Sequence, residues 1–273
     1  MLSRSPQSLE IGEWRRARVG KSLAARRHQV SRVNVKMPQM KSWALTLMLA
    51  QLSTVALGAE YGHYDLAKVI SIGGASTRDP RATVNVPYLG RILDDLNSHV
   101  GMWPPQFDSA EDRRRAEHDV TALSSMLDTF VEDHSVGPPL ILRLALLHGF
   151  GHNLDIPGSG EAAEELFITL LKLIPDDPQA NYSFGVFYAQ TSAKRASGIP
   201  YLEKARSLGV QNADYWLGVI HLSLGESAKA TADLTSYTSR VPADLNAAKM
   251  LEAVRNGTFG VKQNGLIGTP SSP

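Results

Sequence analysis

Two histidines and an aspartate are the residues of this chain that are best spaced for metal chemistry. His148, His152 and Asp155 lie four and three residues apart, so they would share one face of a helix. Two imidazoles one helical turn apart can chelate Zn²⁺, and a carboxylate could complete a three-ligand site. The motif is His-Gly-Phe-Gly-His, however, and it lacks the glutamate that acts as general base in HExxH enzymes. A metal-binding or enzymatic role for this face is therefore kept as an alternative to the partner-binding role that the repeat pattern predicts below.

No other pattern in the chain carries an enzyme signature. The Gly149-Phe-Gly151 stretch lacks the third glycine and the preceding strand of a dinucleotide-binding loop. Ser159 lies between two glycines, but no nucleophile-elbow motif surrounds it. The arginines at 113–115 are flanked by acidic residues, which is typical of a solvated helix face rather than a nucleic-acid patch. The sequence therefore predicts a protein that is not an enzyme, with no catalytic residue, no metal and no cofactor.

A repeat of about 34 residues is the dominant pattern. Gly151, Gly185 and Gly218 lie 34 and 33 residues apart, and each directly follows a large apolar residue. Such a period in a helix-compatible sequence marks stacked helical hairpins. The first and third units also agree at a small residue, two apolar residues and a closing proline: Ala163 and Ala230, Phe167 and Leu234, Leu170 and Tyr237, and Pro175 and Pro242. The middle unit slips by one residue and uses Gly198, Leu202, Ala205 and Gly209.

The glycine has a physical role in this pattern. A residue without a side chain at a helix crossing lets two helices approach closely, while large neighbours fill the space beside it. Over residues 144–242 the pattern resembles the tetratricopeptide repeat (TPR) family, and residues 201–218 also resemble Sel1-like repeats. The resemblance implies an all-α fold of antiparallel helical hairpins stacked in a right-handed solenoid. An apolar stripe in residues 243–254 predicts a helix that caps its end.

The resemblance also implies a concave groove lined by the first helix of each repeat. The residues that map to this groove are His148, His152, Gln179, Tyr182, Val186, Gln190, Tyr215, Val219 and Leu222. They lack the lysines and asparagines with which some TPR proteins clamp a C-terminal carboxylate. Their tyrosines and valines predict instead an extended or helical segment of a protein partner, held by aromatic packing. Two alternatives stay open: the chain's own N-terminal helices or tail cover the groove, or the repeats form an oligomerisation module.

A secretory signal peptide is predicted at residues 40–59. A lysine precedes an uncharged apolar run of about fifteen residues that ends in small residues, with cleavage after Gly58 or Ala59. The run is shorter than the ~20 apolar residues of a membrane-spanning helix, although an uncleaved membrane anchor is the alternative. Residues 1–39 would then be a mis-called or leader extension upstream of a start at Met40 or Met37. An organellar transit peptide or a nucleic-acid-binding arm would leave the apolar run unexplained.

Charge limits the kind of partner that the protein can bind, and cysteine content limits the chemistry of the chain itself. The whole chain has 28 basic and 27 acidic residues, but ten of the basic and only two of the acidic residues fall within residues 1–41. The remainder holds 18 basic against 25 acidic residues, a net charge of −7. This acidic charge gives no electrostatic reason to bind nucleic acid or anionic membrane. The chain has no cysteine, which excludes disulfides, thiolate metal sites and lipid attachment at a cysteine.

Five parts are therefore expected along the chain. After the extension at 1–39 and the signal peptide at 40–59, residues 60–139 form a loop and two helices. Residues 140–256 hold three repeats and the capping helix, and residues 257–273 form a flexible tail. We expect a periplasmic or secreted scaffold or adaptor that binds a protein or peptide, without stable membrane insertion after signal cleavage.

Overall fold

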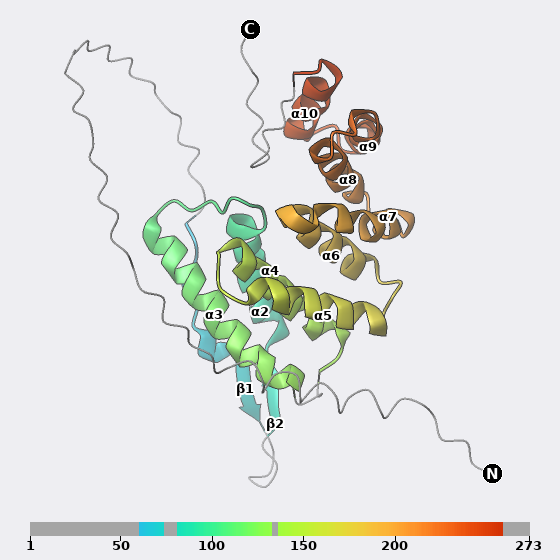
Figure 1. Cartoon of the computed structure of the whole chain (residues 1–273). Helices are drawn as coiled ribbons and strands as arrows, with labels where there is room; N and C mark the ends of the chain where they lie inside the picture. Colours follow the sequence, from blue (N-terminus) through green and yellow to red (C-terminus); the bar gives the residue numbers. More distant parts are fainter. Residues whose placement is uncertain (1–59, 74–80, 133–135, 259–273) are drawn as a thin grey trace, which may run out of the picture. The chain divides into compact units, whose positions relative to one another are not determined.

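The computed structural model describes residues 60–73, 81–132 and 136–258, and these residues form a mostly helical protein (Figure 1). The predicted extension at 1–39, the signal peptide at 40–59 and the tail beyond residue 258 lie outside the described residues. In chain order the helices are η2 (Leu66–Lys68), α2 (Val86–Val100), α3 (Ala110–Glu132), α4 (Pro138–Asn153), α5 (Ser159–Leu173), α6 (Pro178–Gln190), η3 (Ser192–Gly198), α7 (Ile199–Ser207), α8 (Ala213–Ser223), α9 (Ser227–Arg240) and α10 (Leu245–Arg255).

A short antiparallel strand pair lies in the segment that the sequence predicts as a loop. β1 (Ile70–Gly73) pairs with β2 (Arg81–Val84), with Ile70 opposite Val84. β-Branched residues favour the extended backbone, but strands of four residues are too short to show a clear alternation in the sequence. The N–H of Asn85 donates to Val69 O at 2.7 Å, which ties the strand pair to the start of α2.

Polar side chains mark the starts of several helices. Asn85 accepts a hydrogen bond from Tyr88 N at the start of α2 (3.2 Å), and Ser109 accepts one from Asp112 N at the start of α3 (3.0 Å). Asp244 caps α10 in the same way. Such caps satisfy backbone N–H groups that the first turn of a helix leaves unpaired. The starts of α2, α3 and α10 therefore follow from local chemistry.

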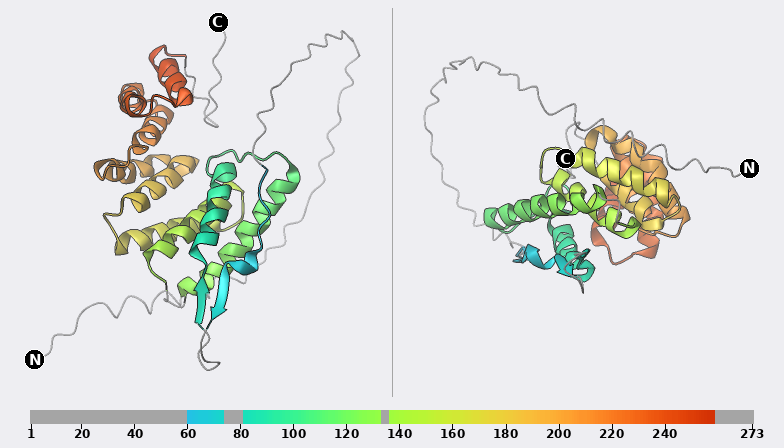
Figure 2. Two further views of the ribbon diagram at one scale, coloured as in Figure 1. Left: turned by 180° about the vertical axis from the view of Figure 1, so that it is seen from behind. Right: turned by 90° about the horizontal axis from the view of Figure 1, so that it is seen from below.

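Helices α4 to α9 form successive helical pairs. α4 packs against α5, α6 against α7 and α8 against α9, and neighbouring pairs also meet through their first helices. The left view of Figure 2 shows these pairs following one another in chain order. The order of contacts is that of a helical-repeat protein, in which each unit contacts mainly its neighbours.

A repeat glycine lies at the crossing of each pair. A Cβ added to Gly151, Gly185 or Gly218 would lie 2.5 to 2.7 Å from a side-chain atom of the paired helix. These side chains are the buried residues Ser159, Leu202 and Leu234, respectively. Because a carbon atom cannot approach that closely without displacing its neighbour, glycine is what allows the helices of each pair to cross at this distance.

The repeat positions on the second helix of each pair are buried. Buried residues at these positions are Ala163, Phe167 and Leu170 of α5, Leu202 and Ala205 of α7, and Ala230, Leu234 and Tyr237 of α9. Pro175 and Pro242 follow the ends of α5 and α9, where proline cannot continue a helix. Gly209 follows α7 with a φ of 93°, a left-handed conformation that suits glycine. α10 then packs against α9 and buries Ala247, Leu251 and Val254.

The front of the described chain forms a core around α4. α2 and α3 each pack against α4, and one apolar cluster joins all three helices to the segment before them. Its fully buried members include Tyr61, Leu89, Leu96, Leu123, Leu127, Leu144 and Leu147. α4 therefore belongs both to this N-terminal core and to the first helical pair.

One repeat position carries a buried polar network. His221 of α8 stands where the other units have Leu154 and Tyr188, and its Nδ1 lies 2.7 Å from Asp233 Oδ2 of α9. Arg206 of α7 reaches the same carboxylate at 3.1 Å. This position, which is apolar or aromatic in the other two units, therefore joins three helices through polar and charged groups.

Replacing Gly185 with alanine tests the close helix crossing. The new methyl group would overlap the fully buried Leu202, so we expect the free energy of unfolding to fall by about 1–3 kcal/mol. Urea unfolding followed by circular dichroism measures this change.

Gly90 of α2 supplies the matched control, because nothing lies within 4 Å of a Cβ added there. Gly90→Ala should raise the free energy of unfolding by about 0.5–1 kcal/mol through helix propensity. Equal effects of the two substitutions would contradict the role assigned to the crossing.

Candidate partner-binding surface

One position recurs three residues before each repeat glycine, on α4, α6 and α8. It is occupied by His148, Tyr182 and Tyr215, all of which the sequence assigns to the predicted groove. His148 is buried, and its Nε2 lies 3.2 Å from Asp128 Oδ1 of α3. Tyr182 and Tyr215 stay partly exposed. The chain's own N-terminal region therefore covers this position in the first helical pair.

The three residues with metal-ligand spacing do not converge. The ring of His152 packs against Phe187 with centroids 5.6 Å apart, and His152 Nε2 lies 3.4 Å from Thr191 Oγ1. Asp155 lies beyond the end of α4 at Asn153, with a left-handed backbone (φ 61°) and a side chain that is 82% exposed. Within the described ranges, no group of three or more histidine, aspartate or glutamate side chains is placed to hold a metal ion.

Two amide side chains hold the loop that follows α2. Gln190 of α6 donates from Nε2 to Gly101 O (3.1 Å) and accepts at Oε1 from Trp103 N (2.8 Å). Asn153 of α4 donates to Val100 O (2.8 Å). Gln190, which the sequence assigns to the groove, is therefore bound to the backbone of the chain itself. The side chain of Trp103 is left 55% exposed on this loop.

An apolar surface formed by α6, α8 and α10 is more accessible to solvent than the buried position of His148 on α4. Tyr182 and Val186 of α6, Tyr215 of α8 and Met250 of α10 are partly exposed and pack around one buried cluster. The ring of Tyr215 lies edge-on to Trp216, with centroids 5.6 Å apart. We refer to Tyr182, Val186, Tyr215 and Met250 as the aromatic face.

The phenols near this face are held in an apolar environment. Burial raises the pKa of Tyr182 and of Tyr215 above the ordinary value. Tyr237 packs against Tyr215 at 5.4 Å and donates to Asp244 Oδ2 at 3.0 Å. Burial, together with this hydrogen bond, raises the pKa of Tyr237 to about 12. The tyrosines are therefore neutral at pH 7 and combine an apolar ring with a polar tip.

Two other residues assigned to the groove are buried, and a third is exposed on α6. Val219 and Leu222 are only 5% and 3% exposed and belong to the apolar clusters of the third pair. Gln179 is exposed and donates to Ser183 Oγ at 3.1 Å. The repeat register alone does not separate surface positions from packing positions, because α8 is buried on more sides than α6.

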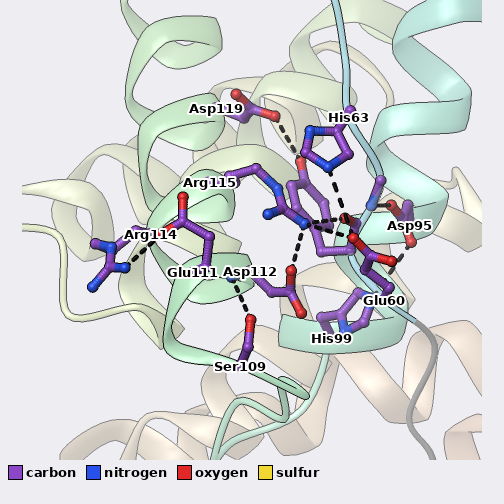
Figure 3. Close-up of polar contacts among 12 residues, drawn as sticks. Glu60, His63, Asp95, His99, Ser109, Glu111, Asp112, Arg114, Arg115 and Asp119 are labelled. Carbon is purple, nitrogen blue, oxygen red and sulfur yellow. Dashed lines mark hydrogen bonds and ion pairs between the residues drawn. The ribbon is translucent and has the colours of Figure 1, made fainter.

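A polar cluster that no sequence motif indicates joins residues 60–65 to α2 and α3. Figure 3 shows the part of this cluster around Glu60 and His63. Arg115 of α3 contacts both Glu60, at 3.5 Å, and Asp112. Tyr61 donates to Asp119 Oδ2 at 3.0 Å. The signal in the sequence was the helical spacing of Asp112, Arg115 and Asp119, which lie on one face of α3.

Comparison with known proteins does not extend the sequence resemblance. No protein-family model matches the chain, and no curated protein or solved structure matches it. Among the helices of the described residues, none has both the length and the apolar character needed to cross a membrane. The resemblance to TPR proteins therefore stays a prediction from the repeat pattern of the sequence.

Two tyrosines in the polar cluster predict a loss of stability in alkali. Burial and a carboxylate partner raise the pKa of Tyr61, beside Asp119, and of Tyr64, beside Asp95. In the unfolded chain these phenols ionise near pH 10. Their contribution is therefore complete below pH 10, and the free energy of unfolding falls as the pH rises above it. The fall is up to about 1.4 kcal/mol per pH unit for the buried Tyr61 and smaller for Tyr64, because solvent screens its partly exposed phenol.

Urea unfolding between pH 8 and pH 11 measures this slope. Tyr61→Phe should make the slope shallower, because one phenol no longer ionises on unfolding. Tyr201→Phe, on α7, controls for the general effect of losing a tyrosine. A slope that Tyr61→Phe leaves unchanged would show that this phenol does not contribute.

Proposed function

We propose that this protein is an exported, non-catalytic scaffold or adaptor built of TPR-like helical pairs, and that its aromatic face binds a segment of a partner protein. The observation that carries the proposal is the threefold recurrence of the position before each repeat glycine. In the first pair, His148 contacts Asp128 of the chain's own helix α3. In the second and third pairs, Tyr182 and Tyr215 occupy this position and remain partly exposed.

The contact with α3 also favours one kind of partner. α3 is a helix of 23 residues that packs against α4 and contributes Val120, Leu123 and Leu127 to the shared core. A helical segment that packs on α6 and α8 would repeat this arrangement one and two units further along the chain. Tyrosine suits such a contact because a rigid ring buries a large area at low entropic cost.

The proposed location depends on the apolar run at residues 40–59. A signal peptide there would export the remaining chain to the periplasm or outside the cell. The acidic charge of the exported part favours a protein partner with a neutral or basic surface over nucleic acid or anionic membrane.

Site-specific photo-crosslinking tests the proposal. A photoreactive phenylalanine derivative is placed at position 182 or 215 of the full chain, in the cells that produce it. Position 232 on α9 is the control, because Ala232 is exposed and lies outside the aromatic face. A product of one defined mass is expected at 182 and 215 and not at 232, and mass spectrometry then identifies the partner.

The purified partner is then titrated with variants of the face. We expect Tyr182→Ala with Tyr215→Ala to weaken binding at least about tenfold, because aromatic anchors carry much of an interface's binding energy. The matching double phenylalanine variant should retain most of the affinity and the same helical circular dichroism. A partner that binds the alanine variant as tightly as the parent would contradict the proposal, and a crosslinked product of twice the chain mass would indicate self-association instead.

A further inference from the structure

The segment Glu60–Tyr64 is neither helix nor strand, yet it contains one of the largest fully buried side chains in the described residues. Tyr61 has an exposed fraction of 0% and belongs to the core that α2, α3 and α4 share. Its ring packs edge-on against His99 of α2, with centroids 5.8 Å apart. An extended segment with an aromatic side chain inserted between two helices has the form of a bound peptide.

Polar groups on both helices recognise the backbone of this segment. Arg115 of α3 donates from Nη2 to Tyr61 O at 2.8 Å, and Gly62 N donates to Asp95 Oδ2 of α2 at 2.9 Å. Further along, Asp65 N donates to the hydroxyl of Tyr88 at 2.9 Å. Main-chain hydrogen bonds of this kind hold an extended peptide in one register.

Side-chain contacts add selectivity for two tyrosines around a glycine. The hydroxyl of Tyr61 donates to Asp119 Oδ2 at 3.0 Å, and that of Tyr64 donates to Asp95 Oδ2 at 2.7 Å. A Cβ at Gly62 would lie 2.9 Å from Tyr64 Oη and 3.1 Å from Asp95 Oδ2. Phenylalanine at either tyrosine would remove one hydrogen bond to a carboxylate, and a side chain at position 62 would crowd the Tyr64 hydroxyl and the Asp95 carboxylate.

The helices hold these recognition groups through contacts of their own. Asp112 pairs with Arg115 one turn away on α3, as Figure 3 shows. His99 Nδ1 lies 3.1 Å from Gln106 O, and its ring stacks on Phe107 at 5.3 Å. Groups that are held in place before the peptide arrives bind it at lower entropic cost.

We propose that the face between α2 and α3 is a peptide-binding site for an extended Tyr-Gly-X-Tyr segment, which this chain fills with its own residues 61–64. The site is separable from its occupant, so a free peptide of the same sequence can replace the segment. His63 occupies the X position and does not contribute to selectivity. Its side chain is 74% exposed, and its ion-pair partner, Glu60, is exposed as well. The inference is independent of the aromatic face and of the function proposed for it.

A nicked form of the full chain tests this inference. A recognition sequence for a specific protease is inserted between Gly73 and Arg81, and the purified protein is cleaved there. The N-terminal fragment that carries residues 60–73 is then attached to the rest of the protein only by non-covalent contacts. The nicked protein is incubated with an excess of a fluorescent synthetic peptide of residues 60–73, both directly and after refolding from urea. We expect the labelled peptide to co-elute with the protein in gel filtration.

Competing peptides and receptor variants separate specific recognition from apolar adhesion. A peptide with Tyr61→Ala should compete at least about tenfold more weakly than the parent peptide, because it loses both the buried ring and a hydrogen bond. A peptide with His63→Ala should compete as well as the parent. In the protein, Asp95→Ala should reduce capture at least about tenfold, whereas Asp94→Ala, at the exposed neighbouring position, should not.

Three results would overturn the proposal. The first is failure to incorporate the labelled peptide, both directly and after refolding. The second is equal competition by the Tyr61→Ala and parent peptides. The third is equal capture by the Asp95→Ala and Asp94→Ala proteins. Any of these would make residues 60–64 an inseparable part of the core instead of a bound ligand.

Discussion

Gly151 occupies the point where three helices meet, and the arrangement of the described chain depends on this contact. A Cβ at this position would lie 2.5 Å from Ser159 Oγ of α5 and 3.4 Å from Val120 Cγ1 of α3. The carbonyl of Gly151 also accepts the N–H of Ile156, at 2.8 Å, in the turn between α4 and α5. A larger residue would therefore disturb both the first helical pair and the N-terminal core, because α4 belongs to each.

The sharing of α4 explains why equivalent repeat positions have different environments. His148 is buried against α3, whereas Tyr182 and Tyr215 have no counterpart of α3 above them among the described helices that pack on α6 and α8. The loop held by Gln190 extends the covered region as far as the C-terminal end of α6. A surface that would be uniform in an ideal repeat array is thus divided into a covered part and an accessible part, and the proposed partner site lies in the second.

Several features of the fold could be predicted from particular residues. The glycine spacing predicted the three helix crossings, because close approach requires a missing side chain at regular intervals. The spacing that suggested the metal-binding alternative could not be judged from the sequence in the same way. His148, His152 and Asp155 share a face only if the helix continues to residue 155, but α4 ends at Asn153. The docked segment at residues 60–64 escaped sequence reasoning because its contacts join positions more than thirty residues apart and follow no period.

The sequence by itself determined the helical class of the described chain and the repeat period, because these depend on local spacing and on the conformational limits of glycine and proline. Tertiary structure decided which faces of the repeats remain accessible. Burial of His148 requires α3, engagement of Gln190 requires the loop after α2, and insertion of Tyr61 requires both α2 and α3. Each of these contacts joins distant segments, and a pattern read along one segment carries no information about what packs on it from another.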